Sequence, residues 1–308
     1  MNKIKADLVN FIFESSHNQQ WIIFFRIAIG ILALFHFIAI LPDFALLFST
    51  NGIIPSDIMG VFISDKVITL PKIIVFFQDL NIQESSVLSV FKTLYISLSI
   101  FLIFGFLPRI SALFLLILQI SLLKGASFYS YGVDFFTSMS LFYLALIPSH
   151  STFSLRKYLF RKIKILNITP YLRLMQLHLS IAYFFSGLSK ILGFNWWNGE
   201  AVWKAINLPF ANLDFQFDFS FLLEYPGIFI IIGWATIVIE LCYPLFIWWR
   251  KTRKPWLFLT ISMHIGIALV LNLYFFSMIM IIWNLTLFYM PYKPEVLRIF
   301  NSNHLATK

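Results

Sequence analysis

Long runs of apolar residues recur along this chain, separated by shorter polar segments. A helix needs about 20 apolar residues to cross a bilayer core of about 30 Å. Eight runs approach this length, and we expect a membrane-spanning helix in each: 20–41, 87–107, 110–124, 133–149, 169–190, 226–248, 256–275 and 276–292. The pattern therefore predicts an all-α, multi-pass membrane protein, a bundle of about eight transmembrane helices.

The composition also indicates a membrane protein and excludes an ordinary soluble domain and a nucleic-acid-binding domain. Hydrophobic residues make up 59 % of the 308 residues and charged residues only 12 %, whereas soluble domains have about 25 % charged residues. The net charge of +9 is carried by short basic clusters between the apolar runs, which fits a lipid surface better than nucleic acid. The single cysteine, Cys242, excludes an internal disulfide.

The distribution of lysine and arginine predicts the orientation. With the N-terminus inside, sixteen of these residues fall in inner segments and five in outer ones, as the positive-inside rule requires. We therefore expect a multi-pass protein of the cell (inner, cytoplasmic) membrane with both termini in the cytoplasm. Residues 4–19 are amphipathic and are expected to lie on the inner surface, with no cleavable signal.

Two long segments, 42–86 and 191–225, lie on the outer side in this topology. Each contains apolar stretches interrupted by prolines, so we expect interfacial helices folded over the outer end of the bundle. Because we find no internal repeat or linker, we expect a single domain over 1–308, with its core at about 20–292.

Ionisable residues inside spans are costly and mark candidate functional sites. Counting along each helix at a rise of about 1.5 Å per residue predicts an inner polar layer of Arg26, Gln176, Glu240 and His264. One interpretation is structural, an ion pair between Arg26 and Glu240 with His264 as a bonded neighbour. The other is a proton path.

A second polar layer is predicted near the outer face, formed by His36, Asp134, Lys190 and Asn272. Gln176, Tyr183 and Lys190 follow one another at seven-residue spacing and share one helix face. Lys190, at a helix end, either extends to the membrane surface or acts as a functional amine. The six histidines do not pair at the spacing of a zinc helix, so no metal site is expected.

Gln176–Lys190, followed by Trp196-Trp197-Asn198-Gly199, resembles the signature of the HTTM family, which is related to the vitamin K-dependent gamma-carboxylase. Further motifs extend this resemblance over about 20–292: Leu47–Pro55, Gly105–Arg109, Tyr131–Asp134, Pro148–Leu155, and His264 with Phe276-Ser277. In size and layout the chain also resembles small bacterial HTTM proteins such as the membrane component of the sporulation-delaying toxin system.

The resemblance implies a chemistry for Lys190. In the carboxylase, the lysine of this motif is held to deprotonate a hydroquinone, whose reaction with oxygen yields a base that removes a glutamate γ-proton before carbon dioxide adds. On this interpretation Lys190 is the catalytic base, and Asp134, Tyr183, Trp197 and Gln176 shape a substrate site in the outer half of the membrane.

Two departures from the carboxylase keep other functions open. The histidine near the start of its fourth helix is absent from Tyr131–Asp134, and only about 16 residues follow the last predicted span, so we expect no large C-terminal domain. The chain is then either an enzyme for quinone- or oxygen-linked modification of a secreted peptide or small molecule, or a non-catalytic component of peptide (toxin) maturation or export. A proton-coupled transporter using Arg26, Glu240 and His264 is the third alternative.

Overall fold

The computed structural model describes residues 20–50, 52–55, 58, 61, 66–148, 167–219, 221 and 224–292. This part of the chain contains helices and no β-strand. It divides into two compact units, one of residues 1–21 with 167–308 (unit 1) and one of residues 22–166 (unit 2). No sequence feature indicated this division, and the single domain over 1–308 stays a prediction.

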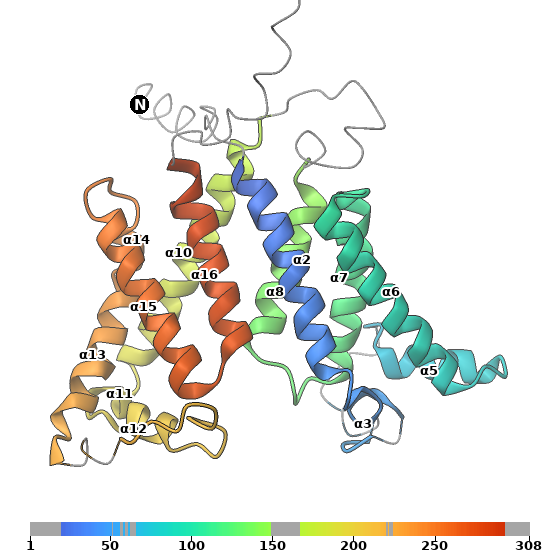
Figure 1. Cartoon of the computed structure of the whole chain (residues 1–308), viewed down its shortest axis with the longest axis horizontal. Helices are drawn as coiled ribbons and strands as arrows, with labels where there is room; N and C mark the ends of the chain where they lie inside the picture. Colours follow the sequence, from blue (N-terminus) through green and yellow to red (C-terminus); the bar gives the residue numbers. More distant parts are fainter. Residues whose placement is uncertain are drawn as a thin grey trace, which may run out of the picture. The chain divides into compact units, whose positions relative to one another are not determined.

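Unit 2 is built from the helices in the first half of the chain (Figure 1). They are α2 (Gln20–Ile40, all but its first two residues in this unit), α3 (Phe44–Phe48), α5 (Leu70–Asp79), α6 (Glu84–Phe104), α7 (Pro108–Gly125) and α8 (Gly132–Leu146). Helix α7 packs against both α6 and α8. The pocket described below lies where α2, α7 and α8 approach the same end of this unit.

The turn between α6 and α7 explains Arg26. Its Nη1 donates to the carbonyls of Leu102 (3.0 Å) and Ile103 (3.3 Å), in the last turn of α6. A Cβ at Gly105, which ends α6 with φ +71°, would overlap the guanidinium. Arg26 therefore satisfies helix-end carbonyls, where a positive charge is also favoured by the helix dipole.

Unit 1 contains the helices of the second half of the chain. They are α10 (Thr169–Ile191), α11 (Phe194–Trp197), α12 (Glu200–Ile206), α13 (Gly227–Leu241), α14 (Tyr243–Phe246), α15 (Arg253–Leu271), α16 (Tyr274–Phe288) and a 3-10 turn at Met290–Tyr292. Helix α10 packs against α13, and α15 against α16. Asn272, in the left-handed region at φ 56°, makes the tight turn between α15 and α16.

Each of the eight apolar runs contains a helix, which confirms the all-α membrane fold. Five helical segments in the described part are long and apolar enough to cross a bilayer: α2, α6, α7, α15, and α16 together with the turn that continues it to Tyr292. Helices α8 and α13 are apolar but have only 15 residues each, so the count of eight spans stays a prediction. Large side chains such as Phe104, Ile231 and Phe258 are more than half exposed, as expected of helices that face lipid.

The run 226–248 is not one helix as expected. Helix α13 ends at Leu241, and the short α14 begins at Tyr243. Pro244 explains the break, because it has no N–H to donate to the carbonyl of Glu240, four residues earlier. Glu240 therefore lies in the last turn of a helix and not in the middle of one.

The two segments predicted on the outer side do form short helices. Segment 42–86 contains α3 and α5, and segment 191–225 contains α11 and α12. Three sets of residues lie outside the described part of the chain: the segment 4–19 that is expected on the inner surface, the motif at 148–155 beyond residue 148, and many of the basic residues that set the orientation. The interfacial position and the orientation remain predictions.

The close approach of α10 to α13 gives the first test. A Cβ on Gly187 would lie 2.5 Å from the backbone nitrogen and 2.8 Å from the Cα of Leu241. We expect Gly187→Ala to force the two helices apart and to lower the free energy of unfolding by about 1–3 kcal/mol, as overpacking does. Gly266→Ala is the matched control, because no atom lies within 4 Å of its added Cβ. Thermal unfolding in detergent measures both, and equal midpoints would contradict the prediction.

Candidate functional site

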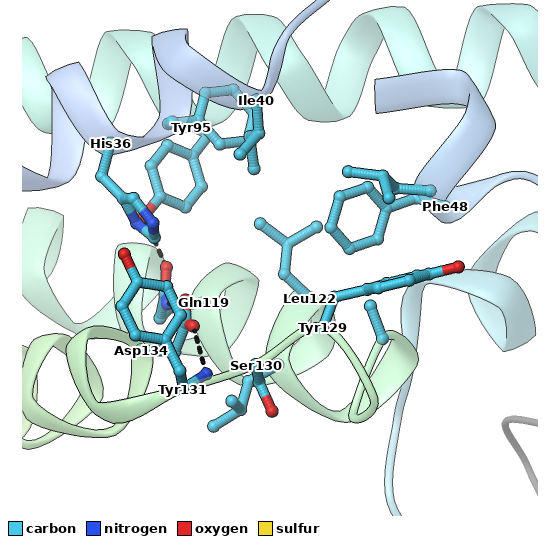
Figure 2. Close-up of a pocket in the computed structure, with 14 residues that line it drawn as sticks. His36, Ile40, Phe48, Tyr95, Gln119, Leu122, Tyr129, Ser130, Tyr131 and Asp134 are labelled. Atoms are coloured by element: carbon cyan, nitrogen blue, oxygen red, sulfur yellow. Dashed lines mark hydrogen bonds between the residues drawn. The ribbon is translucent and has the colours of Figure 1, made fainter. Parts of the chain in front are cut away.

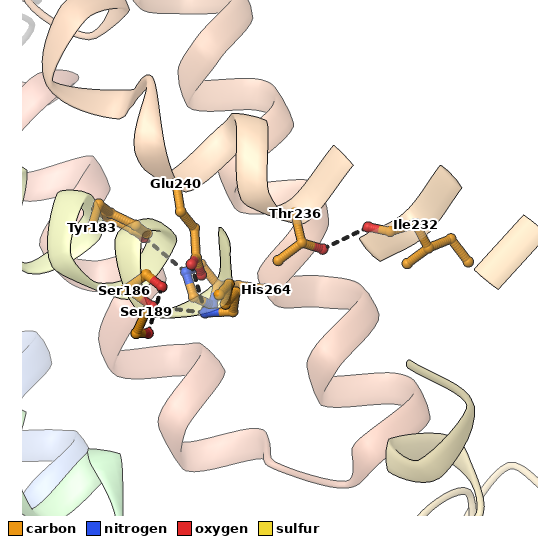
Figure 3. Close-up of polar contacts among 8 residues, drawn as sticks. Tyr183, Ser186, Ser189, Ile232, Thr236, Glu240 and His264 are labelled. Atoms are coloured by element: carbon orange, nitrogen blue, oxygen red, sulfur yellow. Dashed lines mark hydrogen bonds and ion pairs between the residues drawn. The ribbon is translucent and has the colours of Figure 1, made fainter. Parts of the chain in front are cut away.

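Lys190 and Glu240 form the central ion pair of unit 1 (Figure 3). Lys190 lies in the last turn of α10, and its Nζ is 2.6 Å from Oε2 of Glu240 in the last turn of α13. The same Nζ donates to Oγ of Ser186 at 2.7 Å and lies 5.2 Å from the ring centroid of Trp196. The side chains are only 17 % and 8 % exposed. The ammonium group is therefore held inside the unit by three contacts.

Two features of the backbone bring these charges together. Gly187 lets α10 approach α13 at Leu241, and the break before Pro244 ends α13 at that point. From the sequence, Glu240 and His264 are expected in an inner layer and Lys190 in an outer one. The structure instead brings Lys190 into contact with Glu240 and close to His264. The separation of Lys190 from the layer of Glu240 was therefore wrong.

A separate chain of buried hydrogen bonds lies in the same unit and ends at His264. The hydroxyl of Tyr243 donates to Oδ1 of Asn284 at 2.8 Å, and Nδ2 of Asn284 donates to the Tyr183 oxygen at 2.8 Å and to the Met280 carbonyl at 2.9 Å. The Tyr183 hydroxyl lies 2.7 Å from Nε2 of His264. Since only a donor can serve the Met280 carbonyl, the amide orientation is fixed, and the Tyr183 hydrogen remains for His264.

This arrangement assigns the tautomer of His264. Its Nε2 accepts from Tyr183, so Nδ1 carries the hydrogen of a neutral ring. His264 is 2 % exposed, and its Nδ1 has no hydrogen-bond partner among the described residues. Lys190 lies close enough to the ring to interact with it electrostatically. A buried donor without a partner is costly, and here it lies next to the ion pair.

The other predicted residues of unit 1 have structural contacts. Nε2 of Gln176 donates to the Leu287 carbonyl at 2.6 Å and so joins α10 to α16. Nε1 of Trp197 donates to the Ile191 carbonyl at 2.8 Å, at the end of α10. The structure therefore brings Tyr183, Glu240 and His264 close to Lys190, whereas Gln176 and Trp197 have other hydrogen-bond partners.

Sequence reasoning missed several members of this cluster. Asn284 lies inside the run 276–292, and an amide in a membrane helix is a signal that could have been used. Ser186 stands one helical turn before Lys190, a spacing that places the two side chains side by side. Tyr243 and Trp196 gave no signal, because aromatic residues are common throughout this chain.

Asp134 and His36 belong to unit 2 and line a pocket there (Figure 2). Asp134 accepts from Nε2 of Gln119 at 3.3 Å and from the backbone N–H of Tyr131 at 3.1 Å. The Tyr95 hydroxyl donates to Oε1 of Gln119 at 2.5 Å. Burial, and then the negative charge of Asp134, raises the pKa of Tyr131, which precedes α8, to about 12. The predicted outer layer is thus divided between the two units.

The described residues contain no group of three or more His, Cys, Asp or Glu side chains that could hold a metal ion. The ion pair and the hydrogen-bond chain of unit 1 contribute a lysine, a carboxylate, phenols and an imidazole. These are the groups that transfer protons.

Comparison with known families identifies the class of protein. The sequence matches the HTTM domain over residues 56–292, more than half of the chain. The chain therefore belongs to the HTTM family of membrane proteins, which is related to gamma-carboxylase. No curated protein and no solved structure matches it.

The ion pair predicts how single and double substitutions of Lys190 and Glu240 change the free energy of unfolding. Lys190→Met and Glu240→Gln each leave a poorly exposed charge without its counter-ion, so each should cost about 3 kcal/mol. The double variant should lose less than the sum, because neither charge remains. Lys204→Met is the control, since its pair with Glu200 is exposed and should matter little. Chemical unfolding in detergent measures the cycle, and additive losses would show that the two side chains are not coupled.

Proposed function

We propose that this chain is an integral-membrane enzyme in which Lys190 is the base that removes a proton from a weakly acidic hydroxyl group. The hydroxyl of a hydroquinone is the group that the family resemblance implies, and the final product would be a modified peptide or small molecule at the outer half of the membrane. The observation that carries the proposal is the 2.6 Å contact of Lys190 with Glu240 in a poorly solvated site.

The environment of the pair lets a lysine act as a base. Removing two charges from water costs several kcal/mol per ion, and their attraction only partly offsets this cost. Transfer of the proton from Nζ of Lys190 to Oε2 of Glu240, along the existing hydrogen bond, removes both charges and leaves a neutral amine and a neutral acid. Glu240 is thus a positioning residue that also stores the proton.

Charge balance favours the next step. When the neutral amine of Lys190 takes a proton from a hydroxyl, an ammonium and a substrate anion appear side by side. One ion pair has then been replaced by another, with no net charge left in the apolar site. The ring of Trp196, which already lies 5.2 Å from Nζ, also favours the ammonium by a cation–π contact.

The residues around the pair fit a hydroquinone. The Trp196 ring offers a flat apolar face, and the unpartnered Nδ1 of His264 offers a donor for a ring oxygen. When bound, such a group supplies an acidic hydroxyl and two electrons. Tyr183, bonded to His264 and Asn284, fixes the direction in which that donor points.

The decisive test separates a base from a structural charge. Lys190→Arg keeps a positive charge for Glu240, but a guanidinium stays protonated and cannot act as a base. In lipid nanodiscs supplied with a soluble hydroquinone, we expect oxygen uptake by wild-type protein and a loss of about 100-fold or more in Lys190→Arg and Lys190→Met. Lys204→Met should retain full activity, because Lys204 is exposed and pairs only with its helix neighbour Glu200.

Two results would overturn the proposal. Full activity of a stable Lys190→Arg protein would show that Lys190 is a structural charge and not a base. If wild-type protein consumes no oxygen, and mass spectrometry finds no quinone or modified peptide co-purified with it or with Lys190→Ala, the chain is a non-catalytic partner and not an enzyme.

A further inference from the structure

We propose that the pocket of unit 2 is a binding site for a small organic cation, an amine attached to one ring-sized apolar body, with Asp134 as its counter-ion. This site belongs to unit 2 alone and is independent of the function proposed for Lys190.

The pocket has a polar end and an apolar end. Figure 2 shows His36, Tyr131 and Asp134 gathered at one end, with Phe48 and Tyr129 at the other. The walls come from the C-terminal ends of α2 and α7, the N-terminal end of α8, the short α3, and Tyr95 in the middle of α6. Most of the lining therefore comes from helix ends.

The carboxylate of Asp134 is held in place but retains capacity to bind. The Gln119 amide and the Tyr131 N–H are neutral donors, and each occupies one acceptor position on one of its two oxygens. A carboxylate has about four acceptor positions. The Tyr95 hydroxyl holds Gln119 from the other side, so the amide hydrogens must face Asp134. A negative charge at a fixed place in a cavity wall attracts a cationic donor most strongly.

Aromatic rings complete a site for an ammonium group. Tyr95 and Tyr131 line the pocket near Asp134. The negative face of such a ring attracts an ammonium ion, and a cage of rings with a carboxylate is a recurring way to bind organic cations. An anionic ligand would instead meet the charge of Asp134, so the wall selects against it.

The size of the pocket limits the ligand. Its volume is about 190 Å³, and an apolar protein cavity of about 150 Å³ holds one benzene molecule. The pocket therefore has room for one ring and a short chain. The apolar end, at Phe48 and Leu122, would take the ring, and the polar end at Asp134 would take the amine.

Phenethylamine, phenethyl alcohol and phenylacetate test the proposal, since they share a ring and a two-carbon chain and differ chiefly in the head group. Calorimetric titration into protein in phosphatidylcholine nanodiscs, with empty nanodiscs as the blank, should show binding of the amine, weaker binding of the alcohol and none of the acid. Asp134→Asn should weaken binding of the amine by about tenfold or more, as loss of a hydrogen bond to a charged group does. Asp43→Asn, an exposed carboxylate of the same unit that does not line the pocket, should leave it unchanged.

A second variant keeps the result clear if Asp134→Asn unfolds. Leu122→Trp should fill the apolar end and abolish binding of the amine, while thermal unfolding without ligand reports whether the variant is folded. The proposal is overturned if phenethylamine does not bind, if a folded Asp134→Asn protein binds it equally well, or if phenethyl alcohol binds as tightly as the amine.

Discussion

Hydrocarbon offers no hydrogen bonds, and this constraint accounts for most polar contacts in the structure. Every charge or amide within an apolar helix must find its partner inside the protein. Lys190 and Glu240 do so by pairing with each other. Arg26 does so by bonding the last carbonyls of α6. The same constraint makes these contacts chemically important, since a charge held away from water interacts strongly with whatever approaches it.

Both candidate sites lie where helices end. Lys190 and Glu240 occupy the last turns of α10 and α13, and Asp134 occupies the first turn of α8. A helix end is where the chain can turn away and where backbone groups need partners, so polar side chains accumulate there. Pro244 ends α13 early, so Glu240 lies in the last turn of a helix and not in the middle of a span.

The two units carry different chemistry on a similar plan. In each, a line of neutral hydrogen-bonding side chains ends near a charged group: Tyr243, Asn284, Tyr183 and His264 lead toward the lysine pair in unit 1, and Tyr95 and Gln119 lead to Asp134 in unit 2. Such lines fix the orientation of amides and rings that could otherwise rotate. Unit 1 thus presents an amine suited to taking a proton, and unit 2 a carboxylate suited to holding a cation.

The sequence by itself determined the class of structure and the candidate base. Apolar runs long enough to cross a bilayer predict helices whatever packs around them, and the family motif singled out Lys190 without any structure. The partner of Lys190 was decided by the tertiary structure. Helical counting placed Lys190 in a different layer from Glu240, whereas their contact depends on the space left by Gly187, where α10 approaches α13 at Leu241. Periodicity shows on which face of its own helix a residue lies, but only the packing of the helices decides which residues of a neighbouring helix it contacts.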